Sequence, residues 1–279
     1  MAYNDKDIQS FVDHVGRLCV KGGTQFPQCF ENFLDLQLQF FCNNVNARQK
    51  ELFTYMKEHE SFRKDMSEAM QILGDLSEGY HDVLGEIFMS RITHGENGQF
   101  FTPEAITEMM TQVIQPTYNG ETICDPACGS GRTLLSALKH MREIQKVEPI
   151  LYGNDLSITC AKMTLINFLL NSADGMVTCG NTLTDRKDEY TFFKIDRLKN
   201  LYTGVIVSTY WQYTMETIDD VEEQRKQWWR DIAKMGWIRH TTSRKTNEDD
   251  TETTESEPSG DDTLPEDAPK DKNIQLSLF

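Results

Sequence analysis

The sequence is short of basic residues. It has 28 Lys and Arg residues against 44 Asp and Glu residues, and its net charge is −16. This balance argues against a large basic DNA-binding face, because such a face needs clustered Lys and Arg. From Glu248 to Lys272 eleven acids and two lysines carry −9 of this charge. Any contact with nucleic acid is expected to be local, or to be supplied by a partner subunit.

Other features are missing as well. No apolar run approaches the roughly 18 residues that a membrane span requires, and the first residues, MAYNDKDIQS, lack the basic and apolar regions of a secretory signal. Seven cysteines are scattered along the chain without a CxxC pair. These absences predict a cytoplasmic protein with reduced thiols, without membrane association and without a metal site.

Residues 1–95 are expected to form an α-helical domain. Four stretches in it space their apolar residues three and four positions apart, as amphipathic helices do. They cover residues 10–20, 30–41, 51–62 and 82–92.

Residues 96–240 have a different pattern, in which short apolar runs alternate with helical stretches. Strands are expected within 121–126, 148–155, 175–181 and 203–208, and helices within 130–141, 158–170 and 215–238. Strand, Gly-rich turn, helix, strand, acid and helix is the opening of an α/β, Rossmann-like doubly wound domain. Residues 241–273 are rich in Thr, Glu, Asp, Ser and Pro and predict a disordered acidic linker.

The segment DPACGSGR, residues 125–132, predicts a ligand-binding loop. Asp125 ends the first expected strand, Gly129 and Gly131 allow close approach of a ligand, and the next helix offers free N–H groups. Asp155 follows Gly131 by 24 residues, at the tip of the second expected strand. An acid there accepts hydrogen bonds from ribose hydroxyls. A Gly-x-Gly turn alone is common after strands, and it is the whole set that indicates a nucleotide-type ligand.

Residues 79 to about 208 resemble the adenine-N6 DNA methyltransferases that form the modification subunits of type I restriction-modification systems. The matching stretches, in the family's order, are GYHDVLGEIFMSR, GQFFTPEAI, DPACGSGRTLL, LYGNDLS and MTLINFLLNS. The resemblance implies a shortened S-adenosylmethionine (SAM) methyltransferase domain. It also implies SAM as cofactor, DNA as a partner, reached directly or through another subunit, and restriction-modification subunits as further partners.

The resemblance also implies which residues line a SAM site. They are Phe101, Thr102, Pro103, Asp125, Pro126, Ala127, Gly129, Gly131, Asp155 and Asn181. The segment 101–103 would lie against the methionine part, Asp125 would meet the ammonium group, and Asp155 would hold the ribose. Asn181 departs from the family, which has an Asp there that touches the adenine amino group, so some affinity is expected to be lost.

The family's catalytic loop is missing. That loop, Asn-Pro-Pro-aromatic, orients the adenine N6 and stacks on the flipped base. At the expected place this chain has Thr209, Tyr210 and Trp211, and it contains no Pro-Pro pair. Losing one polar contact of this kind costs about 10²–10³ in rate, and losing the rigid turn as well should cost more. Tyr210 and Trp211 either stack a base in an altered pocket or cover the end of a strand.

Two further features concern the C-terminal third. Trp228, Trp229 and Trp237 are expected to pack over the sheet edge rather than to bind nucleic acid. Residues 274–279 are apolar, and the last five resemble the peptide by which bacterial replication and repair proteins bind the sliding clamp. These five are Gln275, Leu276, Ser277, Leu278 and Phe279. They predict the sliding clamp as a partner, and so a bacterial or phage-infected cytoplasm.

Three functions remain open from the sequence. The first is an adenine-N6 methyltransferase homologue that binds SAM, has weak or no methyl transfer, and is tethered to the sliding clamp. The second is an active methyltransferase that works with a partner subunit. The third is an interaction or decoy protein without a ligand. Whether the chain is an enzyme is not decided by its sequence.

Overall fold

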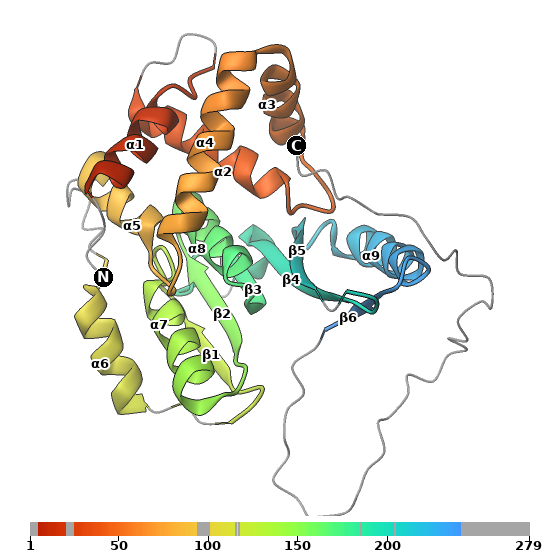
Figure 1. Cartoon of the computed structure of the whole chain (residues 1–279). Helices are drawn as coiled ribbons and strands as arrows, with labels where there is room; N and C mark the ends of the chain where they lie inside the picture. Colours follow the sequence, from red (N-terminus) through yellow and green to blue (C-terminus); the bar gives the residue numbers. More distant parts are fainter. Residues whose placement is uncertain are drawn as a thin grey trace, which may run out of the picture.

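The computed structural model describes residues 5–20, 25–93, 101–114, 116, 118–184, 186–203 and 205–240. Helices α1 to α4 gather at one end of the molecule, and a mixed sheet extends from beneath them (Figure 1). The expected linker 241–273, the peptide 274–279 and the domain boundary at residues 95 and 96 lie outside the described residues. No helix in the described ranges is long and apolar enough to cross a bilayer.

The first 93 residues are helical where they are described. The elements are α1 (Asp5–Gly16), α2 (Phe26–Gln39), α3 (Ala47–Glu58), α4 (Glu60–Leu76), α5 (Val83–Phe88) and the π-helical turn η1 (Met89–Thr93). Helix α3 begins with a capping box, in which the Asn46 side chain accepts the Gln49 N–H and Gln49 reaches back to the Asn46 N–H.

One expectation about the cysteines is wrong. Cys19 and Cys29 form a disulfide that joins the segment after α1 to α2, with Cα atoms 4.9 Å apart. The other five cysteines are free. The two cysteines are 10 positions apart in the sequence. The packing of α1 on α2 brings them together, and their spacing alone gave no signal.

The α/β part begins with α6 (Glu104–Ile114). It continues through β1 (Thr122–Asp125), α7 (Arg132–His140), the π-helical turn η3 (Met141–Gln145), β2 (Ile150–Asp155), α8 (Ile158–Leu170) and β3 (Asp174–Cys179). The three strands are parallel, in the order β1-β2-β3. Gly175 has φ +144°, and a Cβ there would collide with the Leu151 carbonyl, so only glycine lets β3 pair this closely with β2.

The rest of the sheet is antiparallel and differs from the expectation. After the 3₁₀ turn η4 (Lys187–Glu189) come β4 (Thr191–Asn200), β5 (Ile206–Tyr213), α9 (Ile218–Ala233) and β6 (Trp237–Arg239). Strand β4 pairs with β3, β5 and β6. The sequence predicted neither β4 nor β6, and it ended the fourth expected strand at residue 208, whereas β5 continues to Tyr213.

The helices and the sheet share one apolar core. Phe11 and Phe33 of the N-terminal helices belong to the same buried cluster as Phe168, Val177 and Tyr210 of the α/β part. A smaller cluster of Trp211, Tyr213 and Val221, with Phe192, Ile218 and Trp228 around it, joins α9 to the other face of β4 and β5. The N-terminal helices are therefore packed on the sheet and do not form a separate core.

The two edges of the sheet differ. Beside β5, the Tyr210 N–H donates to the Phe41 carbonyl at 2.9 Å, and the Asn43 N–H donates to the Tyr210 carbonyl at 3.0 Å. The main chain after α2 therefore covers that edge. Strand β1 pairs only with β2 among the described strands, and Thr122 and Cys124 are exposed.

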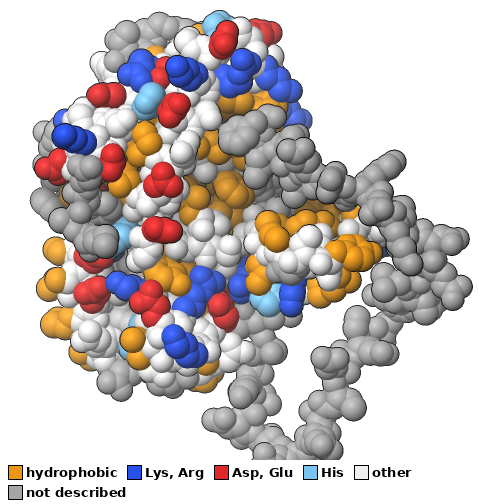
Figure 2. Space-filling view, viewed as in Figure 1, with side chains coloured by type: hydrophobic (Ala, Val, Ile, Leu, Met, Phe, Trp, Pro, Cys, Tyr) orange, Lys and Arg blue, Asp and Glu red, His pale blue; other side chains and the backbone are white. Residues whose placement is uncertain are grey.

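Helix α6 packs with an inverted polarity. The two residues it buries are Thr107 and Thr111, and Thr111 Oγ1 lies 3.2 Å from Ser136 Oγ of α7. Its apolar residues face outward, with Met109, Val113 and Ile114 54%, 77% and 67% exposed. Figure 2 shows hydrophobic side chains on the surface in the region of α6.

Candidate functional site

Three loops meet at the carboxyl ends of β1, β2 and β3. In the sheet register Asp125 lies opposite Gly153, and Asp155 lies opposite Cys179. The loops that leave these strands carry DPACGSGR, Asp155 and Asn181. The carboxyl ends of parallel strands are where doubly wound folds bind their ligands. The sheet therefore brings three of the predicted site segments to one edge.

The Gly-rich loop has the shape that its sequence predicts. Gly129 and Gly131 have φ of +58° and +86°, a region that other residues rarely adopt. The Gly129 N–H donates to Asp155 Oδ2 at 2.9 Å, which ties the loop to the acid of the next strand. From beneath, Thr164 of α8 donates to the Gly129 carbonyl at 2.9 Å, and a Cβ on Gly131 would lie 3.0 Å from the same threonine.

The two aspartates keep acceptor capacity for a ligand. Asp155 accepts the Gly129 N–H on Oδ2 and the Ser157 N–H on Oδ1, at 2.9 and 2.8 Å. Asp125 accepts the Ala127 N–H on Oδ1 at 3.1 Å. A carboxylate offers about four lone-pair sites, so both groups can accept further hydrogen bonds. Both are only partly buried. They fit a ribose diol and an ammonium group.

Exposed apolar side chains flank these acids. Leu156 follows Asp155 and is 72% exposed, and Leu183 in the loop after β3 is 94% exposed. Together with the acids they place both polar and apolar side chains at this edge, the mixture that small-molecule sites use.

The segment 101–103 lies beside the Gly-rich loop. The Phe101 ring stacks on Phe88 with centroids 5.8 Å apart, and a Cβ on Gly129 would lie 2.8 Å from the Phe101 ring. The Thr102 carbonyl accepts a hydrogen bond from Arg132 at 3.4 Å. Pro103 is exposed, and its carbonyl accepts the Ile106 and Thr107 N–H groups at the start of α6. The structure thus brings the predicted segment to the predicted loop.

Asn181 is placed at the same edge, but part of its amide is already engaged. Its Oδ1 accepts the Leu183 N–H at 3.0 Å. Asn154, which the sequence analysis did not single out, joins the loops, because its Nδ2 donates to the carbonyls of Gly180 at 2.9 Å and Pro126 at 3.3 Å. Pro126 and Ala127 are exposed. Asn181 therefore shapes its own turn, and the neighbouring Asn154 fixes the spacing of the loops.

The predicted positions of the catalytic loop are not in a loop. Thr209, Tyr210 and Trp211 lie inside β5. Lys194 of β4 pairs with both Met176 and Trp211, so Trp211 is two strands from β3 and level with its middle. Tyr210 is fully buried, and its hydroxyl accepts a hydrogen bond from Gln49.

The remaining contacts of this segment are structural. The Thr209 hydroxyl accepts a hydrogen bond from Asn43 at 2.9 Å. Trp211 is 2% exposed and packs edge-on against Trp228 at 5.7 Å. The base-stacking interpretation is therefore wrong, since neither aromatic ring has a free face. These residues do not cover the end of a strand either, because they lie within β5, where Trp211 packs against α9 and Tyr210 packs against the N-terminal helices.

The thiols around the site are poor nucleophiles. Burial raises the pKa of the Cys128 thiol, and it raises the pKa of the Cys160 thiol to about 12. Burial also raises the pKa of Cys124 and of Cys179. At neutral pH all four stay protonated, so the site has no thiolate for covalent catalysis.

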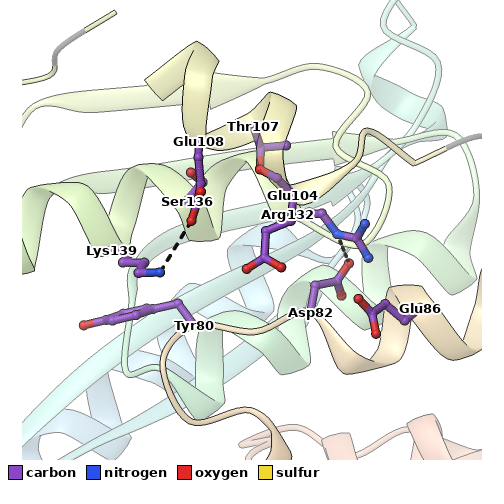
Figure 3. A pocket seen from close by; sticks show the side chains of 9 residues that line it. All are labelled: Tyr80, Asp82, Glu86, Glu104, Thr107, Glu108, Arg132, Ser136 and Lys139. Atoms are coloured by element: carbon purple, nitrogen blue, oxygen red, sulfur yellow. Dashed lines mark hydrogen bonds and ion pairs between the residues drawn. The ribbon is translucent and has the colours of Figure 1, made fainter. Parts of the chain in front are cut away.

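Arg132 also lines a narrow polar pocket (Figure 3). Residues of α5, α6, α7 and the segment just before α5 line it, among them Arg132 and the acids Asp82, Glu86 and Glu104. Arg132 Nε donates to Asp82 Oδ2 at 3.1 Å. Among the described residues no group of His, Cys, Asp or Glu could hold a metal ion. The ion pair with Asp82 anchors Arg132, which follows Gly131.

Sequence reasoning missed the residues that support the loop from inside. Asp82, Asn154, Thr164 and Asn167 are buried, and each makes hydrogen bonds to the loop or its neighbours. The available signal was a polar residue inside an apolar segment, as in MTLINFLL, where Thr164 and Asn167 interrupt a buried helix. Such a residue must find a partner, but the sequence does not say which one.

The described sheet lacks a neighbour on the free side of β1. In a doubly wound fold the ligand lies where strands continue on both sides of the first strand. Here the described strands extend only from β1 towards β2. In the described residues the loops that follow β1, β2 and β3 therefore lie on one side of β1, and no described strand pairs with its other side.

Comparisons with known proteins identify the family of the chain. A family model described as N-6 DNA Methylase matches residues 75–245. The methylase subunit of the type I restriction enzyme MjaIX of Methanocaldococcus jannaschii is 32% identical over 114 residues, which are 38% of this chain and 20% of that protein. The methylase subunit of EcoEI of Escherichia coli is 32% identical over 102 residues, 36% of this chain and 21% of that protein.

The chain thus matches about a fifth of the length of these curated relatives. A crystal structure of a type I restriction-modification methyltransferase subunit from Streptococcus thermophilus is 19% identical, covers 67% of this chain and 42% of that one, and has a TM-score of 0.35. A TM-score at this level adds no argument to the topology. The family match covers more than half of the sequence, and the chain belongs to the N-6 DNA methylase family.

Proposed function

We propose that the chain binds SAM at the carboxyl edge of β1, β2 and β3, and that methyl transfer to adenine by this chain alone is weak or lost. The observation that carries the proposal is the hydrogen bond from the Gly129 N–H to Asp155, which joins the Gly-rich loop to the ribose-binding acid. This hydrogen bond places the Gly-rich loop next to Asp155, and doubly wound folds use such a loop and such an acid to bind a nucleoside.

The residues at this edge suit the parts of SAM. Asp125 would accept a hydrogen bond from the ammonium group of SAM, and Asp155 would accept hydrogen bonds from its ribose hydroxyls. The Gly-rich loop would lie against the methionine backbone, beside Phe101. Asn181 keeps its Nδ2 as a donor, because Oδ1 is used in its own turn. When bound, SAM supplies an activated methyl group. The residues described here bind and orient the molecule that carries it.

The proposal of weak or absent transfer rests on β5. A loop that grips adenine needs an exposed acceptor and a free aromatic face. Thr209 is bonded to Asn43, and Tyr210 and Trp211 are buried. An alternative follows from the free side of β1: a partner subunit could supply the missing strand and loop, and the assembly would then methylate DNA. A decoy protein without a ligand is the third outcome.

Cofactor binding is tested by calorimetric titration of the purified chain with SAM. Asp125→Ala is the site variant. Asp174→Ala is the matched control, because Asp174 begins β3 and so lies at the opposite end of the strands. Micromolar binding that is lost in Asp125→Ala and kept in Asp174→Ala supports the proposal. If the wild type does not bind SAM even at millimolar concentration, the SAM-binding proposal fails and the decoy function without a ligand is favoured.

The partners are a separate part of the proposal. We propose that residues 275–279 bind the replication sliding clamp and that the acidic segment 241–273 is the tether, within a bacterial or phage-infected cytoplasm. Its support is the sequence QLSLF alone. Purified clamp should bind the full chain and should not bind a Leu278→Ala, Phe279→Ala variant. Equal binding of the clamp to the wild type and to the variant would contradict the proposed clamp-binding role of residues 275–279. Restriction-modification subunits are proposed as partners on the basis of the relatives' names.

A further inference from the structure

Asp82 is a buried carboxylate at the junction of three segments that are far apart in the sequence: the start of α5, the Gly-rich loop and α8. It precedes α5 and is 4% exposed. Its Oδ1 accepts the Gly85 N–H and Asn167 Nδ2, both at 3.0 Å. Its Oδ2 accepts Ser130 Oγ, and Arg132 Nε at 3.1 Å. All four lone-pair sites of the carboxylate are therefore used.

Three of these contacts converge on the Gly-rich loop. Ser130 and Arg132 lie on either side of Gly131, and Asn167 Nδ2 also donates to the Ser130 carbonyl at 2.9 Å. Arg132 in turn donates to the Thr102 carbonyl at 3.4 Å, so the same carboxylate reaches the segment 101–103 through one residue. Figure 3 shows the Asp82 carboxylate next to the Arg132 guanidinium, joined by this ion pair.

Gly85 shows that this arrangement is tight. A Cβ on Gly85 would overlap the Asp82 carboxylate and the Ser130 hydroxyl. Gly85 has no positive φ, so the backbone does not require glycine there. The Asp82 carboxylate and the Ser130 hydroxyl, which are hydrogen-bonded to each other, occupy the space where a Cβ of residue 85 would lie. A side chain at position 85 would push the carboxylate away from the loop.

We infer that Asp82 is a positioning residue for cofactor binding: its carboxylate fixes the conformation of Ser130–Gly131–Arg132 and, through Arg132, the position of the segment 101–103. This inference rests on the proposed SAM site. Asp82 lies beneath the loop and acts through it, as supporting residues around a ligand site do.

The test variant is Asp82→Asn, which keeps the size of the side chain. In either amide orientation its NH₂ faces a group that only donates, the Gly85 N–H on one side or the Arg132 guanidinium on the other. The matched control is Asp35→Asn. Asp35 is 3% exposed and is paired with Arg48 and Lys162 at 2.5 and 2.6 Å, but these partners are not in the loop.

Two readouts are measured on the full chain at a temperature where each variant is folded. The first is amide hydrogen exchange of peptides covering residues 126–138. The second is the SAM dissociation constant. Asp82→Asn should speed exchange in this segment and raise the dissociation constant about tenfold or more, since an unsatisfied buried group costs a factor of that order. Asp35→Asn should lower the melting temperature without changing either readout.

The outcomes separate this inference from the proposed function. If the wild type does not bind SAM, the function fails, and exchange alone decides whether Asp82 positions the loop. Unchanged exchange in Asp82→Asn overturns the inference. Faster exchange with an unchanged SAM affinity also overturns it. Should Asp82→Asn not fold, Gly85→Ala and Ser130→Ala replace it, because each disturbs the same contact while Asp82 keeps its charge. Both should then show faster exchange and weaker SAM binding.

Discussion

At the scale of single residues, burial decides what the side chains near the loop can do. Glu86 shares the pocket with Arg132. Burial raises its pKa above the ordinary value of 4.5, Arg132 lowers it, and Asp82 and Glu104 raise it further. Because the net shift is upward, the folded state favours protonated Glu86 and is penalised by the ionised form.

This shift predicts a pH-dependent effect of Glu86→Gln. A group whose folded pKa is raised contributes stability below its unfolded pKa and loses it as pH rises through the folded value. The glutamine variant should therefore melt about 1–3 °C higher than the wild type at pH 7, and the difference should vanish below pH 4.5. Thermal melts at a series of pH values check this. A variant that melts lower at pH 7 would mean that ionised Glu86 stabilises Arg132.

Tyr210 gives the residue-scale test of β5. Its ring is fully buried and its hydroxyl accepts a hydrogen bond from Gln49 at 3.2 Å. Tyr210→Phe should cost about 1 kcal/mol of unfolding free energy, and Tyr210→Ala about 3–5 kcal/mol. Urea unfolding measures both. Tyr202, which is 72% exposed, is the control, and Tyr202→Ala should change little. A catalytic Tyr210 would instead show loss of SAM-dependent activity with unchanged stability.

At the scale of elements, the sequence predicted what local pattern determines. The helix over 158–170 and the strands around β1, β2 and β3 are confirmed, because their apolar runs end in a Gly-rich turn, an acid or a cap. Strand β4 was missed. It alternates Phe193 and Ile195 with Lys194 and Asp196, and these two charges are matched by Glu222 and Arg225 of α9. A charged strand face looks exposed until its partner helix is known.

In the candidate site, too, the sequence predicted the segments that a local pattern marks and missed the contacts between distant residues. The loop with Gly129 and Gly131, Asp155 and the segment 101–103 meet as expected. The contacts of Asp82 and Asn154 were not predictable, because each depends on residues 26 or more positions away. Thr209 to Trp211 were assigned to a loop by the order of the family's motifs. Only the pairing of β5 with β4 and with the segment after α2 shows that they form a strand.

Helix α6 makes an element-scale prediction. Its buried side carries Thr107 and Thr111, and Val113 is 77% exposed. Val113→Glu should change the unfolding free energy by less than about 0.5 kcal/mol. Thr111→Glu, two positions away, should cost about 1–3 kcal/mol, because it buries a carboxylate and removes a contact with Ser136. Comparable losses in both variants, seen in urea unfolding, would contradict the inverted packing of this helix.

At the scale of the whole molecule, the described residues form a sheet with a parallel part, β1 to β3, and an antiparallel part, β4 to β6. The parallel half carries the loop, Asp125 and Asp155. The extension of β4, β5 and β6 packs against α9 and the N-terminal helices, on the side of β3 away from β1. The central claim is that this arrangement keeps cofactor binding and does not support methyl transfer by the chain alone.

One measurement tests that claim most directly. The purified chain is incubated with methyl-labelled SAM and unmethylated mixed-sequence DNA, and label is counted both on the protein after rapid filtration and in the DNA. The account predicts SAM bound to the wild type, none bound to Asp125→Ala, and no label in the DNA above the level of that variant. Label transferred to adenine would contradict the claim from one side, and absence of bound SAM would contradict it from the other.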